Sequence, residues 1–507
     1  MKYLAVLILL FATSVSAQYE RDSAVIIRTY AELQSLNPYK SLDADAAYVQ
    51  AEIFETLTSN DPKTLALVPG LASLPVISND KLTYRYMLLA NTRWSDGKKL
   101  TSDDVVFSFK SAMNPKLING GPLRNYLLDI REISKINEQE FEIKLSKPNP
   151  WHAQTLGSYV VILPKHIWDP NGISDRISWS AVHDENSAHE GLQELAFAME
   201  SQEASLSKKM LIGSGPYKLQ LATPTSEIVL ERDESYWGRG MRGKEAYPKH
   251  LVFRPIYDDN AAARFLMAGE IDVLGSMRTD VYDQIDLSIH KHLAKASAPY
   301  NNFSFIALNN DEPMFKDKLT RQGLAASIDR ASIHKAIMKS EGGLVEGPVA
   351  YMQTNFDKSV RQQTFDVTRA KKLLKDTGWT DSNNDGVLDK TIDGHFTDLS
   401  FTLRINSGNS LRQQVAEMVV KQLAAIVRRW RSKRSTGVHS LRQHAREITT
   451  QHTRPGRVMR QRTISISFGI PLRLRIRAAT SIATVVRRRI SSWSRSDRRS
   501  TRKSASG

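Results

Sequence analysis

The amino-acid sequence predicts an α/β protein with two lobes, and three observations support this fold class. Stretches with strand character alternate with stretches of helical periodicity from residue 23 to residue 426, as in folds whose helices cover sheets. No internal repeat or linker interrupts this alternation, so we expect two lobes of one protein rather than two independent domains. The 507 residues include no cysteine, and a chain of this length can bury a core large enough to fold without disulfides.

The first half of the chain contains strand and helix signals in turn. Alternating or β-branched residues indicate strands at residues 24–30, 81–90 and 140–146. Apolar residues at helical spacing indicate helices at residues 46–57 and 101–113. At the start of the second helix, Thr101 or Ser102 serves as the N-cap, and two aspartates follow near the positive end of the helix dipole.

The second half shows the same alternation. Strands are predicted at residues 301–309 and 398–406, and helices at residues 317–338 and 410–426. We place the first lobe at residues 18–270 and a second, incomplete lobe at residues 271–426.

The first 17 residues, MKYLAVLILLFATSVSA, have the features of a secretory signal peptide. Lys2 precedes an apolar run, and a small-residue cleavage pattern ends at Ala17, so we expect cleavage near the bond between Ala17 and Gln18. A membrane anchor is the weaker alternative, because the apolar run is too short for a bilayer core of ~30 Å. Without cysteine there is no site for a lipid-modified N-terminal Cys, and we expect a free protein in a bacterial periplasm.

The formal net charge of +16 comes entirely from the end of the chain. Residues 427–507 hold 20 Arg and 2 Lys against one Glu and one Asp, whereas the 426 residues before them hold 48 basic and 52 acidic side chains. This tail has no sustained apolar periodicity, and we expect it to be disordered or the product of a frameshift near Ile426. The alternative is a basic tail that binds nucleic acid or a membrane surface. The signal peptide argues against nucleic acid as a partner.

No motif in the sequence supports catalysis. There is no HExxH pair for zinc and no GxSxG elbow for a serine hydrolase. An exported hydrolase is therefore an alternative for which the sequence offers no group of catalytic residues. Residues 381–392, DSNNDGVLDKTI, resemble a calcium loop, but Ile392 stands where a bidentate Glu is required. We expect a polar turn there, and we predict no catalytic residue, no metal site and no cofactor.

Two glycine-containing motifs have structural explanations. In WSDG, Asp96 and Gly97 are expected to form a tight turn with Gly97 at positive φ. The loop GSGPY, residues 213–217, lacks the Lys-Ser/Thr of a P-loop and is expected to let the chain approach another backbone closely. We interpret Asp96, Asp103 and Asp104 as turn and cap residues rather than catalytic carboxylates.

A series of short motifs occurs along the chain in a specific order. It comprises Asn37-Pro38, IFETL (53–57), PGLA (69–72), WSDGKKLTSDDVVFSF (94–109), GSGPY (213–217), Tyr236-Trp237, AGEIDV (268–273), the stretch 305–330 and AKKLLKDTGW (370–379). Over residues 23–426 this series resembles the family 5 extracellular solute-binding proteins, the peptide, dipeptide and nickel receptors of ATP-driven importers.

The resemblance implies a two-lobed type II periplasmic-binding-protein fold with a hinge that closes around a solute. It also implies a monomeric receptor that is not an enzyme, takes an oligopeptide or dipeptide, and delivers it to the permease of an ABC transporter in the inner membrane. The solute-binding residues implied by the resemblance lie in three loops and at one further tyrosine: Tyr39, Ser41, Asp43 and Asp45; Gly275, Ser276 and Met277; Asn406, Ser407 and Asn409; and Tyr126.

The resemblance ends near Ile426. In the family, a helix like the one predicted at residues 410–426 is followed by a strand and by the acidic residue that pairs with a peptide's α-amine, and the chain then returns to the first lobe. No such segment can be found from Val427 onward. This is why we expect the second lobe to be incomplete.

Overall fold

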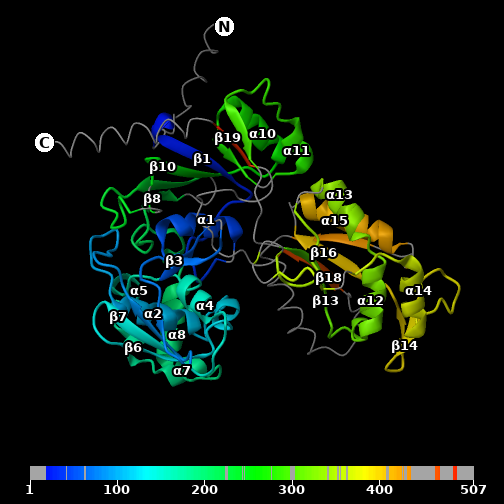
Figure 1. The fold of residues 1–507 in the computed structure, drawn as a ribbon, viewed down its shortest axis with the longest axis horizontal. Coiled ribbons are helices and arrows are strands. Elements are labelled where there is room, and N and C mark those ends of the chain that lie inside the picture. Colours follow the sequence, from blue (N-terminus) through cyan, green and yellow to red (C-terminus); the bar gives the residue numbers. More distant parts are fainter. Residues whose placement is uncertain are drawn as a thin grey trace, which may run out of the picture.

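The structure, a computed structural model, confirms a mixed α/β architecture that Figure 1 shows as two lobes. It describes residues 19–41, 43–61, 64–222, 227–241, 244, 246–275, 277–296, 303–339, 342–350, 353, 356–360, 363–406, 410–424, 426, 431–435, 463–468 and 484–487. In this part of the chain, no helix is both long enough and apolar enough to cross a bilayer.

The largest sheet of the first lobe has seven strands in the order β12-β19-β11-β1-β10-β9-β8. Their bounds are β1 Ala24–Thr29, β8 Tyr217–Ala222, β9 Ile228–Arg232, β10 His250–Pro255, β11 Val273–Leu274, β12 Leu293–Ala296 and β19 Thr484–Arg487. The central strand β1 runs parallel to both β10 and β11. Side chains of a strand alternate between its two faces, and accordingly Ala24 and Ile26 enter one apolar cluster while Val25 enters another. Both faces of this sheet are therefore covered.

The rest of the first lobe is built around an antiparallel sheet of order β4-β5-β7-β6. Its strands are β4 Val76–Ile77, β5 Thr83–Met87, β6 Ile130–Lys135 and β7 Glu140–Leu145, and a separate pair is β2 Thr58–Asn60 with β3 Leu67–Pro69. The helical segments of the first lobe before β8 are η1 Arg21–Ser23, α1 Ala44–Ile53, α2 Ser102–Met113, α3 Gly121–Arg124, α4 His152–Ser158, α5 Lys165–Trp168, α6 Ile173–Arg176, α7 Trp179–His183, α8 Glu190–Glu200 and α9 Glu203–Leu206.

The predicted turn and cap residues have the structural roles expected of them. Thr101 is the N-cap of α2, and its backbone N–H donates to Asp104 Oδ2 at 2.8 Å. Gly97 has φ +90°, as the predicted turn requires. A Cβ on Gly213 would lie 1.9 Å from the carbonyl oxygen of Ile53, which confirms that the GSGPY loop approaches another backbone closely.

The crossing to the second lobe comes later in the chain than predicted. Helices α10 (Asp259–Ala268) and α11 (Thr279–Gln284) pack on one face of the seven-stranded sheet, and β11 and β12 belong to that sheet. The structure thus assigns residues 271–296 to the first lobe, which corrects the predicted boundary at residue 270. The physical reason is strand pairing, because β11 pairs with β1 although most of the first lobe's sequence separates the two strands.

The second lobe contains a sheet of order β13-β18-β16-β17 and a small hairpin, β14 with β15. Its elements are β13 Ser304–Leu308, η2 Pro313–Phe315, α12 Lys318–Ala326, α13 Arg330–Met338, α14 Val367–Asp376, β14 Asp389–Ile392, β15 His395–Asp398, β16 Thr402–Asn406 and α15 Ser410–Leu423. The single helix predicted at residues 317–338 is two helices, because Asp329 caps α13 by accepting from the Ser332 N–H at 3.0 Å.

Three strands lie within the arginine-rich tail, where the sequence analysis identified none. They are β17 (Arg431–Ser435), β18 (Thr463–Phe468) and β19. β18 lies between β13 and β16 in the second lobe, whereas β19 lies between β11 and β12 in the first. The other residues of the tail lie outside the described part, so its disorder and its origin in a frameshift stay predictions.

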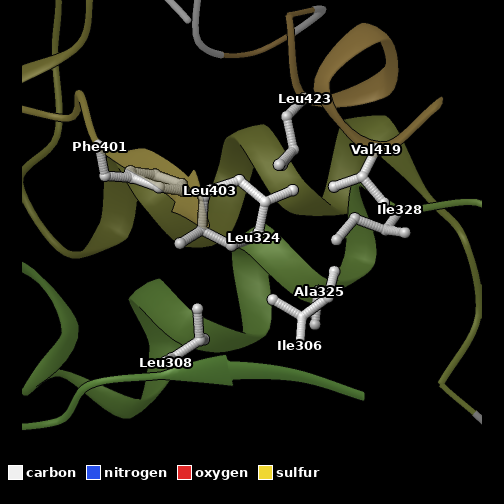
Figure 2. A pocket seen from close by; sticks show the side chains of 9 residues that line it. All are labelled: Ile306, Leu308, Leu324, Ala325, Ile328, Phe401, Leu403, Val419 and Leu423. Atoms are coloured by element: carbon white, nitrogen blue, oxygen red, sulfur yellow. The ribbon is translucent and has the colours of Figure 1, made fainter. Parts of the chain in front are cut away.

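A cavity of about 90 Å³ lies in the second lobe, and Figure 2 shows the side chains that line it. Its described lining is wholly aliphatic or aromatic and comes from β13, α12, β16 and α15 together with two linking residues: Ile306, Leu308, Leu324, Ala325, Ile328, Phe401, Leu403, Val419 and Leu423. Most of these side chains also belong to the apolar core of this lobe or pack against it. Binding sites orient a polar solute with placed polar groups, so this cavity is a packing feature.

Candidate functional site

The candidate site lies at the carboxyl edge of the seven-stranded sheet. β1, β10 and β11 are parallel, so the loops that follow them emerge at the same edge, which is where ligands bind in open α/β sheets. Helix α1 begins at this edge, and in Figure 1 it lies on the side of the first lobe that faces the second.

A buried arginine fixes two of these loops. Arg28, at the end of β1, places Nη1 2.8 Å from Asp259 Oδ1 with its side chain fully buried, and its Nε donates to the Ile256 carbonyl at 2.8 Å. Asp259 Oδ2 in turn accepts from the Arg278 backbone N–H at 3.2 Å. A buried ion pair needs such additional hydrogen bonds, and here they tie the loop after β10 to the loop after β11.

Tyr30 connects the loop after β1 to two of the segments predicted to bind solute. Its backbone N–H donates to Asp45 Oδ2 at 2.6 Å, and its hydroxyl donates to the Gly275 carbonyl at 3.3 Å. Its ring covers the Arg28 guanidinium at 3.9 Å, a cation–π contact. The fold thus brings Asp45 and Gly275 to one place, although they are far apart in sequence.

Asp43 and Asp45 have different roles at the start of α1. Asp43 is the N-cap, and its Oδ1 accepts from the backbone N–H groups of Asp45 at 2.7 Å and Ala46 at 3.3 Å. Asp45 is half-buried, and burial raises the pKa of its carboxyl to about 6, while the hydrogen bond from Tyr30 opposes the shift. Asp45 Oδ1 has no hydrogen-bond partner among the described residues.

Two of the predicted contact residues are buried in the core of the first lobe. Tyr39 is buried, and its hydroxyl donates to the carbonyl oxygens of Val161 at 2.8 Å and Ser108 at 3.2 Å. Met277 is buried in the cluster between the sheet and its outer helices. Both side chains take part in the packing of the first lobe, and their contact with a solute stays a prediction.

The remaining predicted residues are distributed over the molecule. Ser41 Oγ accepts from the Asp43 N–H at 3.2 Å and so supports the start of α1. Tyr126 is 48% exposed and packs edge-on against Tyr159, with 5.2 Å between the ring centroids; its described contacts do not join it to the edge. Asn406 ends β16 in the second lobe. Three predicted residues lie outside the described part: Ser276, Ser407 and Asn409.

The sequence analysis missed four residues at this edge. Arg28 and Tyr30 end or follow β1, whereas Tyr257 and Asp259 follow β10. Tyr257 is 63% exposed, and a hydrogen bond to the Glu32 carboxylate raises the pKa of its hydroxyl. Their position directly after apolar strands was the available signal, but it becomes informative only once β1 and β10 are known to be parallel neighbours.

Two acidic loops that could suggest other chemistry are structural. Asp96 Oδ2 contacts His166 Nε2 at 2.7 Å, and Asp104 Oδ1 accepts from the Lys165 N–H at 2.8 Å. Asp381 Oδ2 accepts from the Gly386 N–H at 3.0 Å, which closes the predicted polar turn. In the part of the chain that the structure describes, no three His, Cys, Asp or Glu side chains are grouped to hold a metal ion.

The two-lobed fold and the site at a parallel sheet edge define a solute receptor by class. The sequence profile of the bacterial extracellular solute-binding proteins, family 5, middle region, matches residues 66–427, and the chain belongs to this family. The match ends one residue beyond the boundary at Ile426 that the composition predicts.

Three relatives illustrate the similarity. The oligopeptide-binding protein AppA of Bacillus subtilis is 28% identical over 414 residues, which cover 80% of this chain and 68% of AppA. The structure of AppA with a nonapeptide matches this structure with a TM-score of 0.68 at 23% identity, and the match covers 89% of this chain and 80% of that one. The dipeptide-binding protein of Escherichia coli is 25% identical over 62% of this chain and 56% of that protein. The oligopeptide-binding protein of Thermus thermophilus, solved with a pentapeptide, has a TM-score of 0.70 at 20% identity, covering 89% of this chain and 77% of that one.

The sequence alignments leave part of these relatives unmatched. The chain spans about two thirds of AppA and little more than half of the dipeptide-binding protein.

Proposed function

We propose that this chain is a receptor for an oligopeptide or dipeptide, which it hands to the permease of an ABC importer without breaking a bond. The observation that carries the proposal is the carboxyl edge of the first lobe, where Tyr30 joins Asp45 to Gly275 by hydrogen bonds. The relatives named above are described as oligopeptide- and dipeptide-binding proteins, which supports the same class of solute.

The proposed mechanism is a shift between open and closed lobes. A solute that contacts the edge of the first lobe and the end of β16 in the second stabilises the closed state by its differential affinity for that state. Closure of a hinge around a ligand is the usual switch in such two-lobed receptors. The signal peptide at residues 1–17 supports export to the periplasm, where the chain would act as a monomer on an inner-membrane permease, with no nucleic acid involved.

The test uses the purified full chain and a mixed pool of short peptides, from dipeptides to nonapeptides. We expect the pool to raise the melting temperature, particular peptides to be retained on the protein and identified by mass spectrometry, and all peptides to be recovered intact. Turnover of the peptides would favour the exported hydrolase, and absence of any shift or retention would refute the proposal.

We further propose that the tail arose by a frameshift near Ile426. The charge composition changes there, and the family match ends at residue 427. Sequencing the gene across this point and detecting tail peptides by mass spectrometry test the idea. One unbroken frame together with tail peptides in the natural protein would reject it.

A further inference from the structure

We infer that the ion pair between Asp283 and Lys339 is a latch between the two lobes, which favours their closed arrangement. Asp283 belongs to α11 of the first lobe, and Lys339 ends α13 of the second lobe. Figure 1 shows these two helices facing each other from different lobes. The inference goes beyond the proposed function, because it concerns the arrangement of the lobes; only the peptide measurement at its end rests on that function.

The packing of α11 turns Asp283 away from the first lobe. Val281 is 1% exposed and belongs to the apolar cluster on the outer face of the seven-stranded sheet. Asp283 follows two residues later, which places it ~200° further round the helix, since an α-helix has about 3.6 residues per turn. Its carboxylate is 46% exposed and pairs with Lys339 of the other lobe.

Helix α13 is fixed to the second lobe by hydrogen bonds to α15. The backbone N–H of Asp329, the N-cap of α13, donates to Gln422 Oε1 at 2.9 Å. Gln422 Nε2 donates to Ser332 Oγ at 3.1 Å. Both members of the ion pair are therefore carried by helices that are held in their own lobes, so the pair connects the two lobes as bodies.

The backbone of Lys339 gives independent support for a role of its side chain. Lys339 is the C-cap of α13 and has φ +48°, in the left-handed region. Glycine is the residue that takes this conformation at a helix end without strain, and backbone strain in other residues is concentrated at functional positions. The ion pair with Asp283 gives a reason for a lysine at a position that favours glycine.

The exposure of the pair fixes the size of its effect. Lys339 is 52% exposed and Asp283 46%, so water and salt weaken their attraction. Separation of the lobes breaks the pair, whereas their approach keeps it, and the pair therefore acts on the closed state alone. An exposed pair of this kind changes the ratio of closed to open receptor about twofold to fivefold.

The experiment measures the separation of the lobes by fluorescence energy transfer in the full chain. The chain has no cysteine, so Gln193→Cys in α8 and Lys371→Cys in α14, both at exposed positions, give one dye site in each lobe. Without peptide, we expect Lys339→Gly to lower the transfer by reducing the closed-to-open ratio about twofold to fivefold. About 0.5 M NaCl, which screens exposed charges, should lower the transfer in the chain with Lys339 and have no effect in the variant.

Two further variants separate the ion pair from other effects of the substitution. Lys339→Gly is expected to fold, because glycine suits the backbone at this position. The charge swap Asp283→Lys with Lys339→Asp should restore the transfer, since it re-forms the pair with the charges exchanged. The matched control is Asp103→Asn, because Asp103 is 48% exposed and pairs with Lys135 inside the first lobe; it should leave the transfer unchanged.

The outcomes distinguish the latch from the proposed function. Equal or higher transfer in Lys339→Gly, or a charge swap that does not restore the transfer, overturns the inference. The pool of dipeptides to nonapeptides should raise the transfer, with about two to five times more peptide needed for half of the effect in Lys339→Gly than in the chain with Lys339. A pool that changes nothing in either chain counts against the proposed function, whereas the latch is decided by the measurements without peptide.

Discussion

Lys244 Nζ lies 2.8 Å from Glu55 Oε1 in the interior of the first lobe, where both side chains are almost fully buried. The same carboxylate accepts from the Tyr236 hydroxyl at 2.9 Å and, through Oε2, from Trp237 Nε1 at 2.9 Å. Lys244 Nζ also donates to the Gly70 carbonyl at 3.1 Å. This hydrogen-bonded network therefore joins three of the motifs that carried the family resemblance: IFETL through Glu55, PGLA through Gly70, and the Tyr236-Trp237 pair. The network gives a structural reason why these three motifs occur together.

The network predicts a large cost for removing one charge. Lys244→Met leaves the Glu55 carboxylate buried without its cation, and we expect a loss of about 3–5 kcal/mol in the free energy of unfolding. Urea unfolding followed by circular dichroism measures it. Replacing both charges, as in Glu55→Gln with Lys244→Met, should cost less than Lys244→Met alone; a larger loss in the double variant would contradict the pairing.

The GSGPY loop predicts a second destabilising variant. In Gly213→Ala the new Cβ would lie 1.9 Å from the Ile53 carbonyl oxygen, so backbone must move, and we expect a loss above about 2 kcal/mol. Gly121→Ala is the control, because nothing lies within 4 Å of its added Cβ. Thermal unfolding of the two variants should separate them, and equal melting temperatures would show that the loop can shift freely.

Asp45 predicts a stability that depends on pH. The pKa of Asp45 is about 6 in the folded chain and ~3.9 when unfolded, so the folded state binds this proton more tightly. The free energy of unfolding therefore falls as the pH rises from about the unfolded pKa to about the folded one. Asp45→Asn removes this loss. Without solute, the variant should be more stable by about 1–3 kcal/mol above the folded pKa and no more stable near the unfolded pKa. Urea unfolding at both pH values measures the difference, and a variant that is less stable at the higher pH would indicate that the carboxylate is fully compensated.

The tail predicts that this chain and a chain with the reading frame restored after Ile426 differ in their thermal unfolding. β17, Arg431–Ser435, contains no apolar residue, and such a strand cannot add to a buried core. We expect the restored chain to melt cooperatively at ~45–65 °C and the present chain to melt lower and less cooperatively. Calorimetry compares them, and a cooperative melt of the present chain in that range would oppose the frameshift.

Local features of this protein could be predicted because neighbouring residues produce them. The capped start of α2 at Thr101, the positive φ of Gly97 and the close approach at Gly213 depend on short motifs, and the structure confirms each. The change in composition at Ile426 likewise marked the end of the family match. Alternating periodicities were sufficient to give the α/β class.

The candidate site depended on contacts that no local pattern contains. Tyr39 belongs to the same loop as Asp43, but its hydroxyl is held by two carbonyls of distant segments and its ring is in the core. Asp45 could be named from its position in that loop, but the pKa of its carboxyl is raised only because the packing around the start of α1 partly buries it.

The sequence by itself determined the fold class, the turns and caps, and the point at which the chain leaves its family. The tertiary structure alone decided which residues share the carboxyl edge and where the first lobe ends. The reason is physical, because periodicity and capping act over a few residues, whereas the edge is created when β1 pairs with β10 and β11 from far along the chain.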